Sequence, residues 1–184
     1  MYRRVRERGP SPESWGEWVA ERNELFVTHP QSPIEDRSRF NGLPYFPYDP
    51  RWRTSGRFAP GDDAIAVAAH SGDGTTRFVV IGVVEFEVAG SPGRLDVLWL
   101  DAYGGGVFLP FRDASNGVST YGGGRYLLDT VKGADLGHTG DEITLDFNYA
   151  YHPSCVHSSG WSCPLAPPAN RLPFTVEAGE RLAT

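Results

Sequence analysis

The sequence is poor in lysine, cysteine and methionine, and it lacks long apolar runs. Of its 17 basic residues only Lys132 is a lysine, and the chain has two cysteines and one methionine. No apolar stretch approaches the roughly 18 residues that a membrane-spanning helix needs, so we expect no membrane partner. The first 30 residues lack the apolar segment of a secretory signal, which favours a cytoplasmic location.

Basic residues are also in the minority, and familiar catalytic motifs are missing. The 23 acidic and 17 basic residues give a pI of about 5.3. This balance argues against a nucleic-acid partner, because the phosphate backbone is recognised mainly by clustered Lys and Arg. The sequence contains no GxSxG, HExxH or GxGxxG run. It therefore does not identify a reaction.

Glycine and proline, by contrast, are abundant. The chain has 22 glycines and 15 prolines among 184 residues, and 22% of its residues are charged. This length and composition are typical of one globular domain that is rich in turns and loops. We predict a single domain over residues 1–184, with a helical arm at 1–41 and a β domain at 42–184.

The arm contains two start signals for helices. Ser11 and Pro12 suit an N-cap and a first helical position, and apolar residues then recur at helical spacing. This helix should end before Pro30. Residues 32–35 resemble a capping box and predict a second, shorter helix that runs to about Phe40.

Beyond residue 42 the apolar pattern changes to the alternation that is typical of strands. Eight short strands are predicted, at residues 51–58, 64–70, 77–88, 94–102, 107–111, 124–131, 142–149 and 173–178. We therefore predict a mainly β fold, an antiparallel barrel or sandwich of about eight strands with two N-terminal helices.

Two segments fit neither strands nor short turns. Residues 112–123 are polar and glycine-rich, and residues 151–172 form a 22-residue stretch rich in proline. Long irregular segments inside a compact domain are uncommon and often functional. We expect residues 151–172 to form a stiff lid that either only closes the core or also borders a binding site.

These segments carry a resemblance to a known family. The motifs are FRDASNGVSTYGGGRY at 111–126, LDFN at 145–148, AYHPSC at 150–155, then Cys163-Pro164, Asn170-Arg171-Leu172 and Ala178-Gly179-Glu180. This ordered set resembles the bacterial and archaeal domain-of-unknown-function family number 1684, from about Trp15 to Leu182. The resemblance implies that both segments belong to the shared feature of the family, and it brings no established activity or cofactor. The family pattern does not favour histidine at position 152 or 157, so a mechanism that needs His152 or His157 would not be shared.

The first segment places Asp113 and Tyr121 near Arg125, which follows three glycines. Glycines let the backbone approach a ligand closely, and a guanidinium binds carboxylate or phosphate through two hydrogen bonds. Arg125 could therefore form an anion site. Alternatively, Arg125 pairs with Asp113 inside the protein and fixes the loop.

The strand predicted at 142–149 directs Asp146 and Asn148 to the same face. Beneath a folded-back lid both would be buried and hydrogen-bonded, and Asn170 could join them. Asp146 could then act as a general base or accept a hydrogen bond from a ligand. The same residues could instead hold backbone amides of the lid as scaffolding.

Cys155 and Cys163 are eight residues apart, and four interpretations are open. They could be packed free thiols, a disulfide, or metal ligands together with His157 and either His138 or His152. Cys155 could also be a nucleophile that a nearby imidazole activates. The spacing matches no strong zinc signature, so zinc is possible as a cofactor but is not favoured.

We predict that the protein binds a small polar or anionic ligand in a pocket at one end of the barrel. The expected lining residues are Arg125, Tyr121, Asp113, Asp146, Asn148 and Asn170. One alternative is a hydrolase-type enzyme that uses Asp146 or Cys155, with or without a metal. The other is a structural or partner-binding domain without a small-molecule site. The sequence leaves the oligomeric state open.

Overall fold

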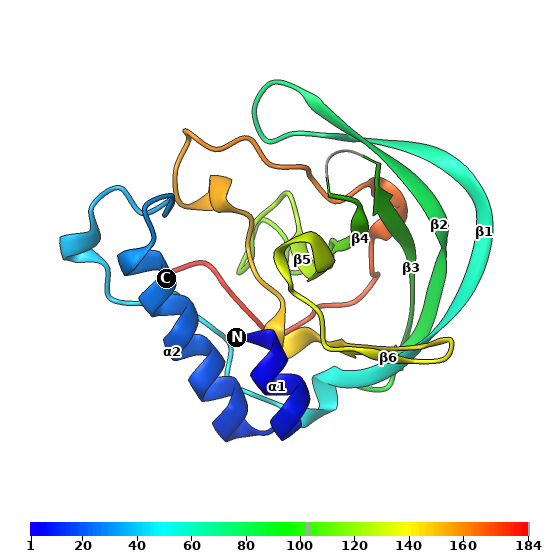
Figure 1. Ribbon diagram of the computed structural model, residues 1–184, viewed down its shortest axis with the longest axis horizontal. Coiled ribbons are helices and arrows are strands. Elements are labelled where there is room, and N and C mark those ends of the chain that lie inside the picture. The colour runs from blue at the N-terminus through cyan, green and yellow to red at the C-terminus, as the bar shows by residue number, and fades with distance from the viewer. Residues whose placement is uncertain (102–103, 184) are drawn as a thin grey trace.

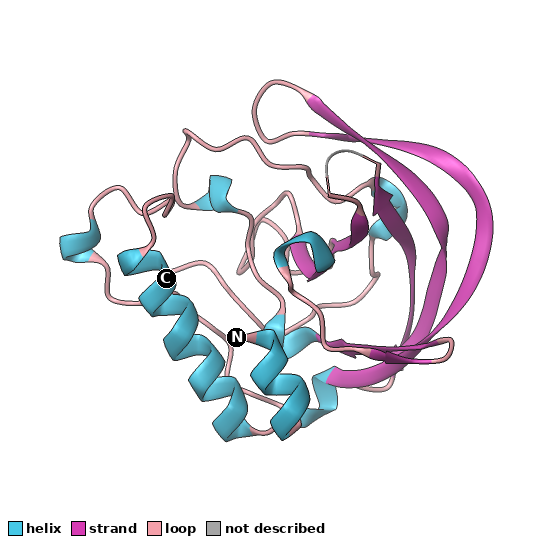
Figure 2. Ribbon diagram, viewed as in Figure 1, coloured by secondary structure: helices cyan, strands magenta, loops and turns pink. Residues whose placement is uncertain are grey.

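A single curved antiparallel sheet of seven strands forms the body of the protein (Figure 1). The structure is a computed structural model that describes residues 1–101 and 104–183. The sheet bends into a half-barrel, and helices and irregular segments lie on the open side of the curve (Figure 2). The mainly β class is thus confirmed, in the form of a half-barrel. No helix in the described ranges is both long enough and apolar enough to span a membrane.

The two N-terminal helices are α1 (Tyr2–Arg8) and α2 (Pro12–Thr28). α2 begins as the sequence predicts, because the Ser11 hydroxyl accepts a hydrogen bond from the Ser14 backbone N–H at 3.1 Å. It ends before Pro30, also as predicted.

The second predicted helix, which was to run to Phe40, is wrong. Only Arg37–Arg39 form a 3₁₀ turn there, whereas the second helix of the arm is α1, which the sequence analysis did not predict. The Ser32 hydroxyl explains the difference. It donates to the carbonyl of Phe26 in the last turn of α2 and accepts from the Ile34 N–H at 3.2 Å, so it holds a turn after α2 and not the first turn of a helix.

The strands are β1 (Arg53–Ala69), β2 (Thr75–Val88), β3 (Ser91–Leu100), β4 (Gly106–Phe111), β5 (Arg125–Asp129), β6 (His138–Thr139) and β7 (Glu142–Asp146). Their order in the sheet is β5-β4-β3-β2-β1-β7-β6. Because both predicted strands at 51–58 and 64–70 pair with β2, they join into the single strand β1, with a register shift between Pro60 and Ala64.

Several strand boundaries differ from the sequence prediction, among them residues 51–52 and 130–131, which belong to 3₁₀ turns. Residues 147–149, the end of one predicted strand, form a 3₁₀ turn. Residues 173–178 form no strand, because carbonyls of this segment accept hydrogen bonds from a buried arginine side chain and not from a neighbouring strand. Ala102, the last residue of the strand predicted at 94–102, lies outside the described residues.

The helical arm is part of the hydrophobic core. Trp18 of α2 is 2% exposed, and its ring lies 5.1 Å from that of Tyr149 and 5.7 Å from that of Tyr2, centroid to centroid. These aromatic residues belong to a cluster that continues to Phe78 of β2 and Tyr126 of β5. The arm therefore covers the open side of the half-barrel.

Replacing Trp18 with alanine should destabilise the whole protein by about 3–5 kcal/mol, because a buried indole is lost from a shared core. Denaturant unfolding followed by fluorescence and circular dichroism should show one transition at lower denaturant concentration. Trp161→Ala is the matched control, since this indole is 39% exposed, and it should cost clearly less. Separate transitions for arm and sheet would contradict a single domain.

Candidate functional site

Glu180 is a fully buried carboxylate that joins three parts of the chain. Its Oε2 accepts a hydrogen bond from Nη2 of Arg22 in α2 at 2.8 Å. The same oxygen accepts from the backbone N–H of His152, in the lid, at 3.0 Å. Its Oε1 lies 3.2 Å from Nε2 of His157 and 3.5 Å from Nδ1 of His152. The arm, the lid and the C-terminal segment therefore meet at one side chain.

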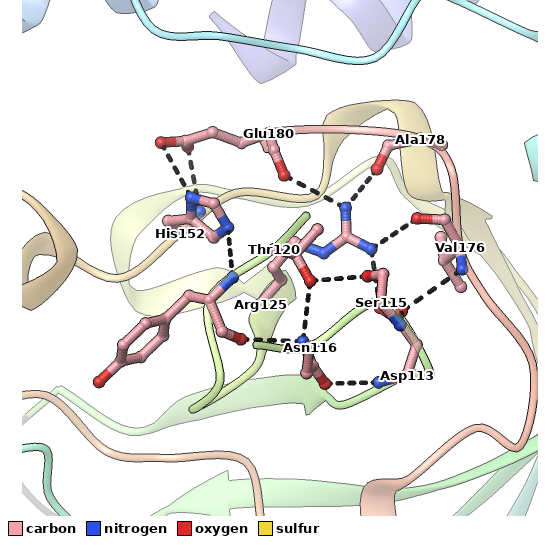
Figure 3. Close-up of polar contacts among 10 residues, drawn as sticks. Asp113, Ser115, Asn116, Thr120, Arg125, His152, Val176, Ala178 and Glu180 are labelled. Atoms are coloured by element: carbon pink, nitrogen blue, oxygen red, sulfur yellow. Dashed lines mark hydrogen bonds and ion pairs between the residues drawn. The ribbon is translucent and has the colours of Figure 1, made fainter. Parts of the chain in front are cut away.

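The charges around Glu180 favour its ionised form. Burial alone would raise the pKa of this carboxyl group, but Arg22 and His152 hold the pKa well below its usual value. Burial also lowers the pKa of His152. The Nε2 atom of His152 accepts a hydrogen bond from the Tyr121 backbone N–H at 3.2 Å, so its proton sits on Nδ1, facing Glu180 (Figure 3). His152 thus acts as a neutral link between Tyr121 and Glu180.

Arg125, the first residue of β5, is completely buried and bonded within the protein. Its Nη2 donates to Oδ2 of Asp113 at 2.8 Å and to the carbonyl of Val176 at 2.9 Å. Its Nη1 donates to the carbonyls of Ala178 and, at 3.2 Å, Glu180 (Figure 3). The structure therefore contains the internal Arg125–Asp113 pair, one of the two arrangements expected from the sequence.

The polar loop at 112–123 is held by its own side chains. Oδ1 of Asp113 accepts from the Ser115 N–H at 2.6 Å, and Asn116 donates to the Tyr121 carbonyl at 2.9 Å (Figure 3). The Tyr121 hydroxyl lies 3.9 Å from Sγ of Cys155. Burial raises the pKa of Tyr121 to about 12. The fold thus brings Asp113, Tyr121 and Arg125 together, as expected, but their hydrogen bonds are to other groups of the same chain.

The other three predicted site residues contact different segments. Asn148 donates to the Asp49 carbonyl at 2.9 Å and accepts from the Asp49 N–H at 3.0 Å. Asn170 makes the same pair of bonds with Asp96, both at 2.9 Å. Both amides fix backbone as scaffolding, but only Asn170 holds the lid in place, whereas Asn148 holds the segment before β1.

Asp146, at the end of β7, is buried, and its two carboxylate oxygens have different surroundings. Its Oδ1 accepts from the N–H and the side-chain amide of Asn148, whereas Oδ2 has no hydrogen-bond partner among the described residues. Asp146 lines a cavity of about 110 Å³ together with Arg53 and with Val5 and Arg6 of α1. Burial raises its pKa to about 6. The arm, and not the lid, borders this residue.

Both cysteines are free thiols in this structure. The Cys155 thiol donates to the Tyr121 hydroxyl, and Cys163 is buried in the lid. Across residues 1–101 and 104–183, no three His, Cys, Asp or Glu side chains are arranged to hold a metal ion. Cys155, His157 and Cys163 are therefore not gathered as a ligand set.

A cavity of about 470 Å³ lies between α2 and the lid, and we call it the α2–lid cavity. Its lining includes Arg22, Phe26, His29, Tyr126, Lys132, Tyr151, His152, Ser154, Trp161 and Cys163. Among its described lining residues none is acidic. The guanidinium carbon of Arg22 lies 4.7 Å from the ring centroid of Tyr151 and 4.9 Å from that of Phe26.

Arg22 was not among the predicted site residues, although its position in the sequence carried a signal. Trp18, Arg22 and Phe26 follow one another at intervals of four residues, so they lie on one face of α2. All three are buried. A charged residue on an apolar helix face must find a partner when it is buried, and Glu180 is that partner.

Comparison with known proteins identifies a family and a solved structure that resembles this chain. The family described as "Protein of unknown function (DUF1684)" matches residues 38–181. A solution NMR structure of an uncharacterised protein from Haloarcula marismortui is 34% identical, with a TM-score of 0.64. The match covers 94% of this chain and 98% of that one. No curated protein matches the chain.

Glu180→Gln should destabilise the protein by about 3–5 kcal/mol, because it leaves the buried Arg22 without a counter-charge. Thermal or denaturant unfolding at neutral pH measures the effect. Glu177→Gln is the matched control: it makes the same change on an exposed residue of the same segment and should have almost no effect. Equal stability of both variants would contradict the role of Glu180.

Asp146→Asn should make the protein more stable than wild type at high pH. The folded pKa of about 6 exceeds the unfolded value of about 3.9, so the native state binds the proton more tightly and wild type loses stability as pH rises between these values. The gain should approach about 3 kcal/mol at a pH of about 8 and shrink toward a pH of about 4. Unfolding measured across pH tests this, with Asp49→Asn as control. A pH-independent difference would contradict it.

Proposed function

The chain belongs to the DUF1684 family of proteins of unknown function, and we propose that it binds a small organic anion in the α2–lid cavity. The observation that carries this proposal is the charge of the cavity wall. Arg22, Lys132 and His29 line it, and its described lining residues include no carboxylate. In a chain with a net charge of −6, such a wall is a local exception that favours an anion.

The size and the aromatic side chains of the cavity support an organic ligand. A volume of about 470 Å³ falls within the range of roughly 300–1,000 Å³ that small-molecule sites occupy. Phe26, Tyr126, Tyr151 and Trp161 contribute aromatic surface to the wall. The ligand class is therefore an anion with an apolar part, and not a bare inorganic ion.

Arg22 is held in place before any ligand arrives. Its guanidinium is fixed by Glu180 and lies between the rings of Phe26 and Tyr151. Its Nε atom is buried and has no hydrogen-bond partner among the described residues. A ligand would therefore meet a donor whose ordering costs little further entropy. Lys132 is more mobile, since 70% of its side chain is exposed.

The hydrolase alternative has less support. The Cys155 thiol contacts the Tyr121 hydroxyl, and the Nε2 lone pair of His152 is occupied by the Tyr121 N–H. Neither contact gives Cys155 a base that could take its proton. Asp146 lies in the separate small cavity beside α1.

Titration with acetate and phenylacetate, followed by NMR of the backbone amides, tests the proposal. Both anions should shift signals of lining residues such as Ser154 and Trp161, whereas neutral phenylacetamide should not. Lys132→Met should weaken binding about fivefold, which corresponds to the loss of one exposed charge contact. Arg94→Met removes a cation from another cavity and should leave the affinity unchanged.

Two results would contradict the proposal. One is the absence of shifts at the lining residues with either carboxylate. The other is equal binding of phenylacetate and phenylacetamide, since the site would then not recognise charge.

A further inference from the structure

We infer that the ligand of the α2–lid cavity is an amphipathic monocarboxylate, a short fatty acid or similar molecule, whose apolar tail enters a second cavity. This inference rests on the proposed function. The second cavity, which we call the tail cavity, has a volume of about 230 Å³. Tyr126, Lys132 and Pro164 line both cavities, so the two adjoin at these residues.

The wall of the tail cavity is mainly apolar. Phe78, Leu100, Phe108 and Val131 line it, and the rings of Phe78 and Phe108 are stacked with centroids 5.3 Å apart. An aliphatic chain that leaves water for such a wall gains about 0.8 kcal/mol for each methylene group. The tail cavity therefore suits a hydrocarbon chain, whereas the α2–lid cavity holds the cationic groups.

The charged side chains of the two cavities determine which end of the ligand lies in which cavity. Asp129 lines the tail cavity and pairs with Lys132 at 2.9 Å. A carboxylate placed on that side would meet a like charge, which is unfavourable. On the other side of Lys132 it would meet Arg22 and His29, and no acidic residue among the described lining. The head group therefore belongs in the α2–lid cavity and the tail beside Phe78.

Tyr126 defines the boundary that the ligand must cross. Its hydroxyl donates to the Pro164 carbonyl of the lid at 2.6 Å, which fixes the ring between the two cavities. The Lys132 ammonium lies 6.0 Å from the centroid of this ring. Because the Lys132 side chain is largely exposed, it can move aside, so we place the crossing point on its side of the ring.

Isothermal titration of the intact protein with acetate, butyrate, hexanoate and octanoate tests the inference. Each added methylene should tighten binding about fourfold until the tail cavity is full. Octanol, which has the tail but no charge, should bind much more weakly than octanoate.

Variants that fill the tail cavity provide the matched test. Val131→Trp should abolish most of the gain in affinity for each methylene group. The position tolerates a larger side chain because Val131 is 38% exposed. Thr76→Phe, on the opposite element β2, should reduce the gain independently if Val131→Trp folds poorly. Val118→Trp makes the same change at a residue that is 82% exposed in the polar loop, and it should keep the full gain.

The outcomes separate the two proposals. If acetate and octanoate bind equally well, the tail inference is wrong while anion binding is judged on acetate alone. If octanol binds as tightly as octanoate, the site does not recognise charge, so the proposed function and this inference both fail. If no carboxylate binds, acetate included, then the proposed function fails and this inference fails with it. A gain per methylene that survives in both filled variants would also overturn the tail cavity as its source.

Discussion

The arrangement of this protein depends on how one buried carboxylate is neutralised. Glu180 lies near the C-terminus, yet its partners come from α2 and from the lid, 158 and 28 residues earlier in the sequence. A charge removed from water must be paired, so the three segments can reach their native positions only together. The half-barrel supplies the frame, and the ion pair between Glu180 and Arg22 attaches the arm to it.

Arg125 also holds the C-terminal segment, through the backbone carbonyls of that segment. Its guanidinium donates to the carbonyls of Val176 and Glu180, and among the described residues no backbone N–H donates to either carbonyl. An arginine side chain thus satisfies backbone groups that a β-ladder would otherwise satisfy. The C-terminal segment is consequently irregular and yet fully buried at Val176, Ala178 and Glu180, with one charged network running through its backbone and side chains.

Local signals in the sequence predicted much of the fold and only part of the site. Alternation and turn residues located β2 and β3, and Ser11 located the start of α2, because these features depend on near neighbours in the chain. The internal pair of Arg125 with Asp113 was also open to prediction. The Glu180 cluster was not, because its contact with Arg22 spans 158 residues of sequence, although the burial of Arg22 was readable from the face of α2. The single long strand β1 depended on pairing with β2, which no local pattern reveals.

The wall of the α2–lid cavity is composite, and this affects how selectivity can change. Arg22 and Phe26 lie on α2, before residues 38–181, which the family model matches, whereas Lys132 and the lid lie within that range. Arg22 also neutralises the buried Glu180, so the residue that carries charge in the proposed site cannot be exchanged alone. A relative with a different charge at this position must also change Glu180, or it leaves that carboxylate buried without a counter-charge.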